Sequence, residues 1–142
     1  MNIAVPQSTI AWEAASRALA AALGEAGQIG VRINVAVVDR GGLLIGFLRS
    51  PGAPLHSVDI AIDKAYTAAS FGLPTGQWSE VLRSHSEGVQ RGIPLRPRFV
   101  IFGGGLPLRV EGEVVGGIGV SGASEEQDEQ CALAGLRAIG LA

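Results

Sequence analysis

The sequence predicts a single domain of the α+β class. Its 142 residues fit one domain of ordinary size, with enough chain to bury a hydrophobic core. Three segments carry apolar residues at helical spacing, and the chain between them holds short runs of β-branched and apolar residues bounded by glycine and proline. We therefore expect one domain over residues 1–142 that combines hairpin strands with helices.

The first half of the chain predicts two helices separated by a hairpin. Ser8 has an N-capping side chain and is followed by apolar residues at helical spacing as far as Gly24. Residues 33–39 and 43–49 are apolar runs joined by the turn sequence RGG, which predicts a hairpin. Residues 56–72 predict a second helix that stops at a glycine. Its alanines would let it pack closely against a sheet.

The second half of the chain predicts strands and a final helix. A short helix is expected to end near Ser84, and residues 85–97, which contain two prolines, are expected to form an irregular surface loop. Residues 98–102, 107–110 and 113–120 have the composition of three short strands. A tight turn at Glu111-Gly112 would join the last two.

Glycines 117, 119 and 122 have the G-x-G-x-x-G spacing of a dinucleotide-binding loop. Such a loop needs a following strand and an acidic residue about 20 positions further on, and the chain ends before that point. Acidic residues also crowd the start of the next helix, where they would repel a pyrophosphate. We therefore expect the glycines to have a structural role, followed by a helix from about Ser124 to Gly140 with a capping box of Ser124 and Gln127.

The composition excludes several classes of partner. The net charge is −2 and no cluster of Lys or Arg forms a basic patch, so neither nucleic acid nor an anionic membrane is an expected partner. Cys131 is the single cysteine, which excludes an internal disulfide and favours a cytoplasmic location. Only 17% of residues are charged while 47% are hydrophobic, and this predicts self-association.

Four blocks of the sequence carry a family resemblance. They are VAVVDRGGLLIGFLR, GAPLHSVDIAIDKAYTAASFGLPT, FGGGLPLRVEGEVVGGIGVSG and EEQDEQCALAGL, in this order. Together they resemble the GlcG/HbpS-like haem-binding family, whose domain also forms the C-terminal part of PduO-type cobalamin adenosyltransferases. The resemblance implies a profilin-like three-layer α/β/α fold, a five-stranded antiparallel sheet flanked by helices, and homo-oligomers from dimer to octamer. It also implies haem or a corrinoid as a cofactor.

The chain offers few side chains that could ligate haem iron. The side-chain types that serve as axial ligands occur at Met1, His56, Tyr66, His85 and Cys131. His56 stands at the start of the second helix, where it either faces a ligand or caps the helix. His85 lies in the expected loop, where it either reaches a site or is solvated. Tyr66 and Cys131 have small apolar neighbours within helices and are expected in the core.

Lys64 lies in mid-helix on a row of small and apolar residues, where a cation is expected to have an anionic partner. It either binds a ligand carboxylate or phosphate, acts as a base after desolvation, or extends to solvent or pairs with an acidic residue of the fold. Asp59 and Asp63 are one helical turn apart, but two carboxylates without a third ligand predict a solvated helix face, and no metal site is expected. Asp39 is expected to form the RGG turn.

The glycines Gly103, Gly104 and Gly105 follow an apolar run, and their N–H groups either bind an anion or let the chain turn tightly. Arg109 and Glu111 in the next hairpin are expected to line the same cleft or a subunit contact.

These residues support three functional hypotheses. The leading one is a small-ligand binding protein for haem or another tetrapyrrole, with a role in haem handling or breakdown. The second is a cofactor-independent enzyme acting on a small carboxylated or hydroxylated metabolite, with Lys64 or His56 as acid or base and Gly104 and Gly105 holding an oxyanion. The third is a non-catalytic accessory subunit.

Overall fold

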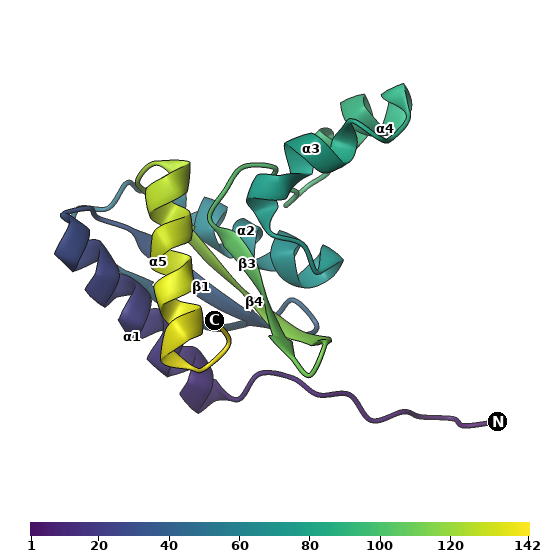
Figure 1. The fold of residues 1–142 in the computed structure, drawn as a ribbon, viewed down its shortest axis with the longest axis horizontal. Helices are drawn as coiled ribbons and strands as arrows, with labels where there is room; N and C mark the ends of the chain where they lie inside the picture. The colour runs from purple at the N-terminus through teal and green to yellow at the C-terminus, as the bar shows by residue number, and fades with distance from the viewer.

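A four-stranded antiparallel sheet forms the middle layer of the protein (Figure 1). The computed structural model describes residues 1–142. The strands are β1 (Asn34–Asp39), β2 (Leu44–Arg49), β3 (Gly105–Val110) and β4 (Glu113–Ser121), in the order β2-β1-β4-β3. Each half of the sheet is a hairpin, and the two hairpins join where β1 pairs with β4. Both expected hairpins are therefore confirmed.

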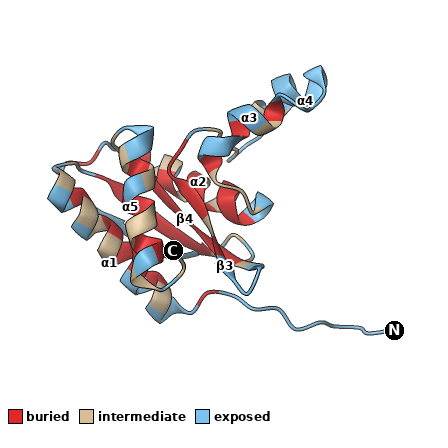
Figure 2. Ribbon diagram, in the orientation of Figure 1, coloured by how far each residue is buried: buried red, intermediate tan, exposed pale blue.

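Helices cover both faces of this sheet. Helices α1 (Trp12–Ile29) and α5 (Glu125–Ala138) pack together over one face, and α2 (Ser57–Phe71) covers the other. A core of 17 buried residues lies between the sheet and the α1–α5 layer, and a smaller cluster of Ala36, Val38, Ala65 and Ala69 lies under α2. Figure 2 shows this burial along the strands and the inner helix faces. The α+β class with a flanked antiparallel sheet is confirmed.

The sheet has four strands, so the expected fifth strand is a wrong prediction. Residues 98–102 do not pair with the sheet, because their backbone bonds to α2 instead. The Thr67 hydroxyl donates to the Arg98 carbonyl at 2.8 Å and accepts from the Val100 N–H at 3.2 Å. Arg98 also has a positive φ of 66°, which breaks an extended run.

Helix α1 begins and ends later than the sequence predicts. Ser8 is not its cap, because residues before Trp12 run beside β4, where the Ile10 N–H donates to the Val115 carbonyl at 2.9 Å. The helix continues through Gly24 and ends where Gly30 adopts a left-handed conformation, with φ of 75°. The tertiary contact of Thr9 and Ile10 with Val115 of β4 therefore overrides the local capping signal.

A helical arm projects from the body between α2 and β3 (Figure 1). It comprises the 3-10 turn η1 (Thr75–Gln77), α3 (Trp78–Leu82), α4 (Glu87–Gly92) and the turn η2 (Ile93–Leu95). The expectation of an irregular loop over residues 85–97 is thus corrected, because Ser86 caps α4 by accepting from the Val89 N–H at 3.3 Å. The capping box of Ser124 and Gln127 at α5 is confirmed.

The glycines of β4 have the expected structural role. A Cβ on Gly119 would collide with the Ala61 carbonyl oxygen and the Ala65 nitrogen, and one on Gly117 would collide with the Ala65 carbonyl oxygen. The backbone of α2 therefore lies directly against β4. This close approach fixes the outer face of α2, which carries the candidate site.

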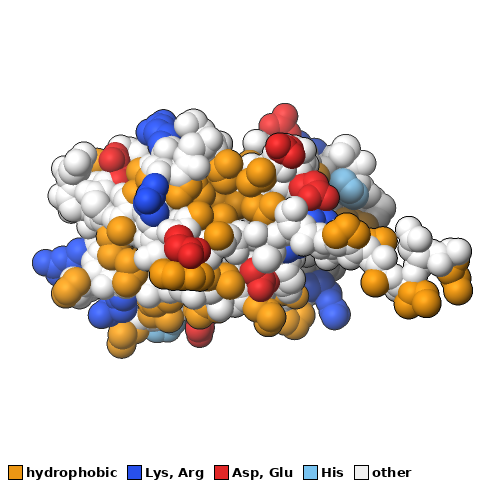
Figure 3. All heavy atoms as spheres, turned by 90° about the horizontal axis from the view of Figure 1, so that it is seen from below, with side chains coloured by type: hydrophobic (Ala, Val, Ile, Leu, Met, Phe, Trp, Pro, Cys, Tyr) orange, Lys and Arg blue, Asp and Glu red, His pale blue; other side chains and the backbone are white.

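Large hydrophobic side chains also remain exposed. They occur on the face shown in Figure 3 and along the N-terminal segment, where Met1, Ile3 and Val5 are exposed. No helix has both the length and the apolar character needed to cross a bilayer. Self-association stays a prediction.

Candidate functional site

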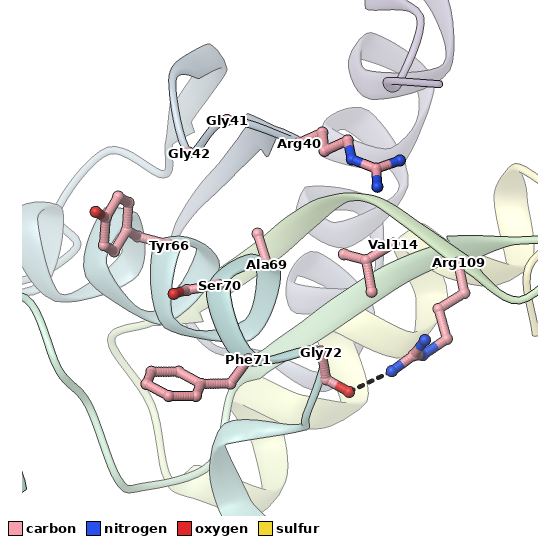
Figure 4. Close-up of a pocket in the computed structure, with 10 residues that line it drawn as sticks. All are labelled: Arg40, Gly41, Gly42, Tyr66, Ala69, Ser70, Phe71, Gly72, Arg109 and Val114. Atoms are coloured by element: carbon pink, nitrogen blue, oxygen red, sulfur yellow. Dashed lines mark hydrogen bonds between the residues drawn. The ribbon is translucent and has the colours of Figure 1, made fainter. Parts of the chain in front are cut away.

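Two adjoining cavities lie on the outer side of α2. They share three lining residues of this helix, Tyr66, Ser70 and Phe71. The larger has a volume of about 480 Å³ and is bounded by the β1–β2 turn, the C-terminal half of α2 and the β3–β4 hairpin (Figure 4). The smaller has a volume of about 220 Å³ and lies between α2 and the end of the arm. The two cavities therefore share one stretch of α2 as part of their walls.

Arg40 and Arg109 are the charged residues that line the larger cavity. Arg109 is positioned by the main chain, since its two Nη atoms donate to the Gly72 carbonyl at 2.6 Å and the Gly112 carbonyl at 3.2 Å. Arg40 Nη1 lies 3.4 Å from the Ser8 carbonyl oxygen and 3.6 Å from a Glu113 carboxylate oxygen. This cavity therefore has a positive lining.

The exposed surface of the smaller cavity is mainly apolar, and Arg96 and Arg98 also line it. Phe71, Phe99 and Trp78 form a cluster of edge-to-face rings with centroids 4.8 to 5.5 Å apart, and the first two line the cavity. The Arg98 guanidinium stacks on the Tyr66 ring, 3.6 Å from its centroid, and donates to Asp63 at 3.0 Å. Tyr66 is thus half-buried at the boundary of both cavities, which corrects the expectation of a core position.

Lys64 lies on the opposite, inward side of α2 and lines none of the five cavities of the structure. Its side chain is 1% exposed and donates to the Val120 carbonyl at 2.8 Å and to Asp128 Oδ2 at 3.1 Å. The Phe102 ring centroid is 5.0 Å away. The counter-charge of Lys64 is therefore Asp128 of α5. A ligand-binding or catalytic role for Lys64 stays a prediction.

Burial and pairing act in opposite directions on this ion pair. Removal from water lowers the pKa of Lys64, and the Asp128 carboxylate raises it back toward its usual value. Burial likewise raises the pKa of Asp128, while Lys64 and the Ala123 N–H, which donates to Asp128 Oδ1 at 3.0 Å, oppose that shift. The pair holds α2, β4 and α5 together.

The Gly103–Gly105 segment lies beside this ion pair. The Gly103 N–H donates to Glu125 Oε1 at 2.7 Å, and the Gly105 N–H donates to the Thr75 hydroxyl at 2.9 Å. A Cβ on Gly104 would lie 2.7 Å from Lys64 Nζ. Two of the three N–H groups are therefore occupied by side chains of the protein, and anion binding by this segment stays a prediction.

The other predicted site residues are scattered. His56 is exposed at the start of α2 and makes no capping bond. His85 is exposed on the arm, with its Nδ1 2.9 Å from the Val81 carbonyl oxygen. Glu111 occupies the β3–β4 turn with φ of 51° and points into neither α2 cavity. Of the residues singled out from the sequence, only Arg109 and Tyr66 come together in one cavity.

The structure adds residues that sequence reasoning missed. Arg40 lines the larger cavity directly before Gly41 and Gly42, and Asp128 pairs with Lys64. The RGG turn was a signal for Arg40, because glycines leave space beside a neighbouring side chain. Asp39 forms that turn as expected, by accepting from the N–H groups of Gly41 and Leu43. Asp63 pairs with Arg98, and no three metal-ligating side chains come together.

Cys131 is a core residue, as expected, and we predict that it is unreactive in the folded protein. Its burial, together with the charges of Asp128 and Glu25, raises the pKa of the thiol from 9.0 to about 11. The reactive thiolate is then scarce at pH 8. Titration with a thiol reagent should modify Cys131 slowly in buffer and quickly in denaturant. Fast modification of the folded protein would contradict this placement.

The chain is similar in sequence and structure to several known proteins. A curated relative, the corrinoid adenosyltransferase PduO of Salmonella typhimurium, is 35% identical over 121 residues, which are 85% of this chain but 36% of that protein. A double mutant of HbpS from Streptomyces reticuli superposes with a TM-score of 0.87 at 37% identity, covering 96% of this chain and 91% of that one. The PduOC:heme complex gives a TM-score of 0.84 at 32% identity, covering 93% and 96%.

The family model gives the same assignment. The family described as haem degrading protein HbpS-like matches residues 10–137. The match includes all four strands, α1, α2 and all but the last residue of α5, together with both cavities beside α2. The chain therefore belongs to the HbpS-like family.

Proposed function

We propose that this protein binds haem in the two adjoining cavities of α2, with the Tyr66 oxygen as the axial ligand. The observation that carries the proposal is the position of Tyr66. Among the five side chains considered as axial ligands, Cys131 is buried, His56 and His85 line no cavity, and Met1 is at the exposed end of the chain. Of these five side chains, only Tyr66 lines the two cavities.

The residues around Tyr66 fit a haem group. A tyrosine oxygen is a known type of axial ligand, and cofactor pockets are lined mainly by hydrophobic and aromatic side chains. Phe71, Phe99 and Ile93 provide such walls in the smaller cavity. The larger cavity alone lies within the range of about 300–1,000 Å³ that is usual for ligand sites. Bound haem would supply a redox-active iron, and Tyr66 would supply the oxygen that holds it. A solved relative is a haem complex, which supports this ligand class.

Two further properties belong to this proposal. The low charged fraction and the exposed hydrophobic side chains support a homo-oligomer, from dimer to octamer. The single free cysteine supports a cytoplasmic location. A role in haem handling or breakdown would use the same binding step.

Absorbance titration with hemin tests the proposal. We expect the wild-type protein to give a saturable Soret shift, and Tyr66→Phe to weaken binding by about tenfold or more, because the phenyl ring keeps the wall but has no ligating oxygen. His56→Ala and His85→Ala should bind as the wild type does. Electron paramagnetic resonance of the ferric complex should change in Tyr66→Phe alone.

Two outcomes would contradict it. Unchanged binding and spectrum in Tyr66→Phe, with loss in one histidine variant, would transfer the axial role to that histidine. A curve that does not saturate in the wild type would reject haem as the ligand.

A further inference from the structure

The larger cavity beside α2 has an unbalanced charge. Arg40 and Arg109 line it, and no carboxylate does. The nearest acidic side chains have other partners or stand outside the cavity. Asp39 Oδ1 accepts from the N–H groups of Gly41 and Leu43 at 2.8 and 3.0 Å, and Glu113 lies 3.6 Å from Arg40 with 56% of its side chain exposed. A cavity with two cations and no internal counter-charge favours an anionic ligand.

Both arginines keep donors for such a ligand. A guanidinium has five N–H donors, and Arg109 uses its two Nη atoms on the carbonyls of Gly72 and Gly112. Those two bonds also fix the plane of the group before a ligand arrives, and Figure 4 shows the one to Gly72. Arg40 uses only Nη1, in long contacts with the Ser8 carbonyl and the Glu113 carboxylate, and its side chain is 30% exposed. Each arginine is therefore free to form at least one charge-assisted hydrogen bond to a carboxylate.

Glycines form the parts of the wall that a side chain would fill. A Cβ on Gly42 would lie 2.6 Å from Tyr66 Cε2, and one on Gly72 would lie 2.7 Å from Arg109 Nη2. Both residues have positive φ, of 83° and 64°. The positions of Tyr66 and Arg109 thus depend on these two glycines, and the same glycines keep the space between them open.

We propose that Arg40 and Arg109 bind the two carboxylates of a dianionic ligand, and that these are the propionates of haem. The propionate assignment rests on the proposed function, and it follows from the shared wall. Tyr66, Ser70 and Phe71 border both cavities, so a ligand with an apolar ring over the smaller one can extend its carboxylates into the larger one. A small free dicarboxylate carries the same two charged groups and is the alternative ligand for the two arginines.

The test compares hemin with hemin dimethyl ester, which has the same macrocycle without free carboxylates. We expect the wild-type protein to bind hemin about tenfold or more tightly than the ester. Arg40→Gln should bind the ester normally and lose most of this preference. Arg17→Gln is the matched control, because Arg17 is exposed and lines no cavity. Arg109→Gln is a second variant, with its folding checked by circular dichroism because it also loses the bond to Gly72.

Each outcome separates the carboxylate site from haem binding. Equal affinity for hemin and the ester would overturn the propionate assignment and leave haem binding intact. Succinate binding, measured by calorimetry, tests the free dicarboxylate as the ligand. Suppose that hemin does not bind, that succinate does, and that Arg40→Gln abolishes the binding of succinate. The carboxylate site is then supported, and haem is not its ligand. If the protein does not prefer hemin to its dimethyl ester and does not bind succinate, the proposed carboxylate site is wrong.

Discussion

Replacing Asp128 by Asn is expected to lower the free energy of unfolding by about 3–5 kcal/mol, because it leaves the Lys64 ammonium buried without a counter-charge. The side chains of Lys64 and Asp128 are 1% and 4% exposed, with a separation of 3.1 Å. Asparagine preserves the size of the side chain, so the loss reports the charge. Urea denaturation followed by circular dichroism measures it.

Two further variants test whether the loss of stability arises from the burial of an unpaired charge. Glu87→Gln removes one partner of the exposed Arg91–Glu87 pair and should not change stability measurably. The double variant Lys64→Met, Asp128→Leu replaces both charges by apolar groups and should recover most of the loss. A wild-type denaturation midpoint in Asp128→Asn would show that Lys64 is not held by this pair.

Replacing Gly119 by Ala is expected to cost about 3 kcal/mol or more, or to prevent folding. The added methyl group would collide with backbone atoms of α2, at Ala61 and Ala65, and backbone cannot move aside as a flexible side chain can. Relief requires α2 to separate from β4, which also displaces the wall formed by Tyr66 and Phe71. Thermal unfolding measures the loss, and hemin titration of any folded variant measures the effect on the site.

Gly27→Ala is the matched control. Gly27 lies in α1 with no atom within 4 Å of an added Cβ, so alanine there should stabilise the protein by about 0.5–1 kcal/mol through helix propensity. Equal stability of the two variants would contradict the close packing of α2 on β4.

Local signals in the sequence predicted those elements whose ends are set by local chemistry. Helix α2 ends at Gly72 and α5 begins at the Ser124–Gln127 capping box, because a left-handed glycine and a capping side chain act within one turn of the helix. The start of α1 and the state of residues 98–102 were predicted wrongly. Both depend on partners distant in sequence, namely Val115 for the segment before α1 and Thr67 for residues 98–102.

The candidate site shows the same division. Sequence reasoning identified Lys64 as a cation that needs an anion, but the partner, Asp128, lies 64 positions further along the chain. Tyr66 has small neighbours in sequence and was therefore assigned to the core. Its exposure depends on the direction in which α2 faces the sheet, and on Arg98, which stacks on its ring from the far end of the arm.

The sequence by itself determined the α+β class, the family resemblance, both hairpins and the structural role of the β4 glycines, because periodicity, turn chemistry and capping are encoded by neighbouring residues. Only the tertiary structure decided that Lys64 is paired inside the fold, and that Arg40, Arg109 and Tyr66 border one cavity. The reason is physical: these three residues come from the β1–β2 turn, the β3–β4 hairpin and α2, and only the pairing of β1 with β4 beneath α2 brings them together.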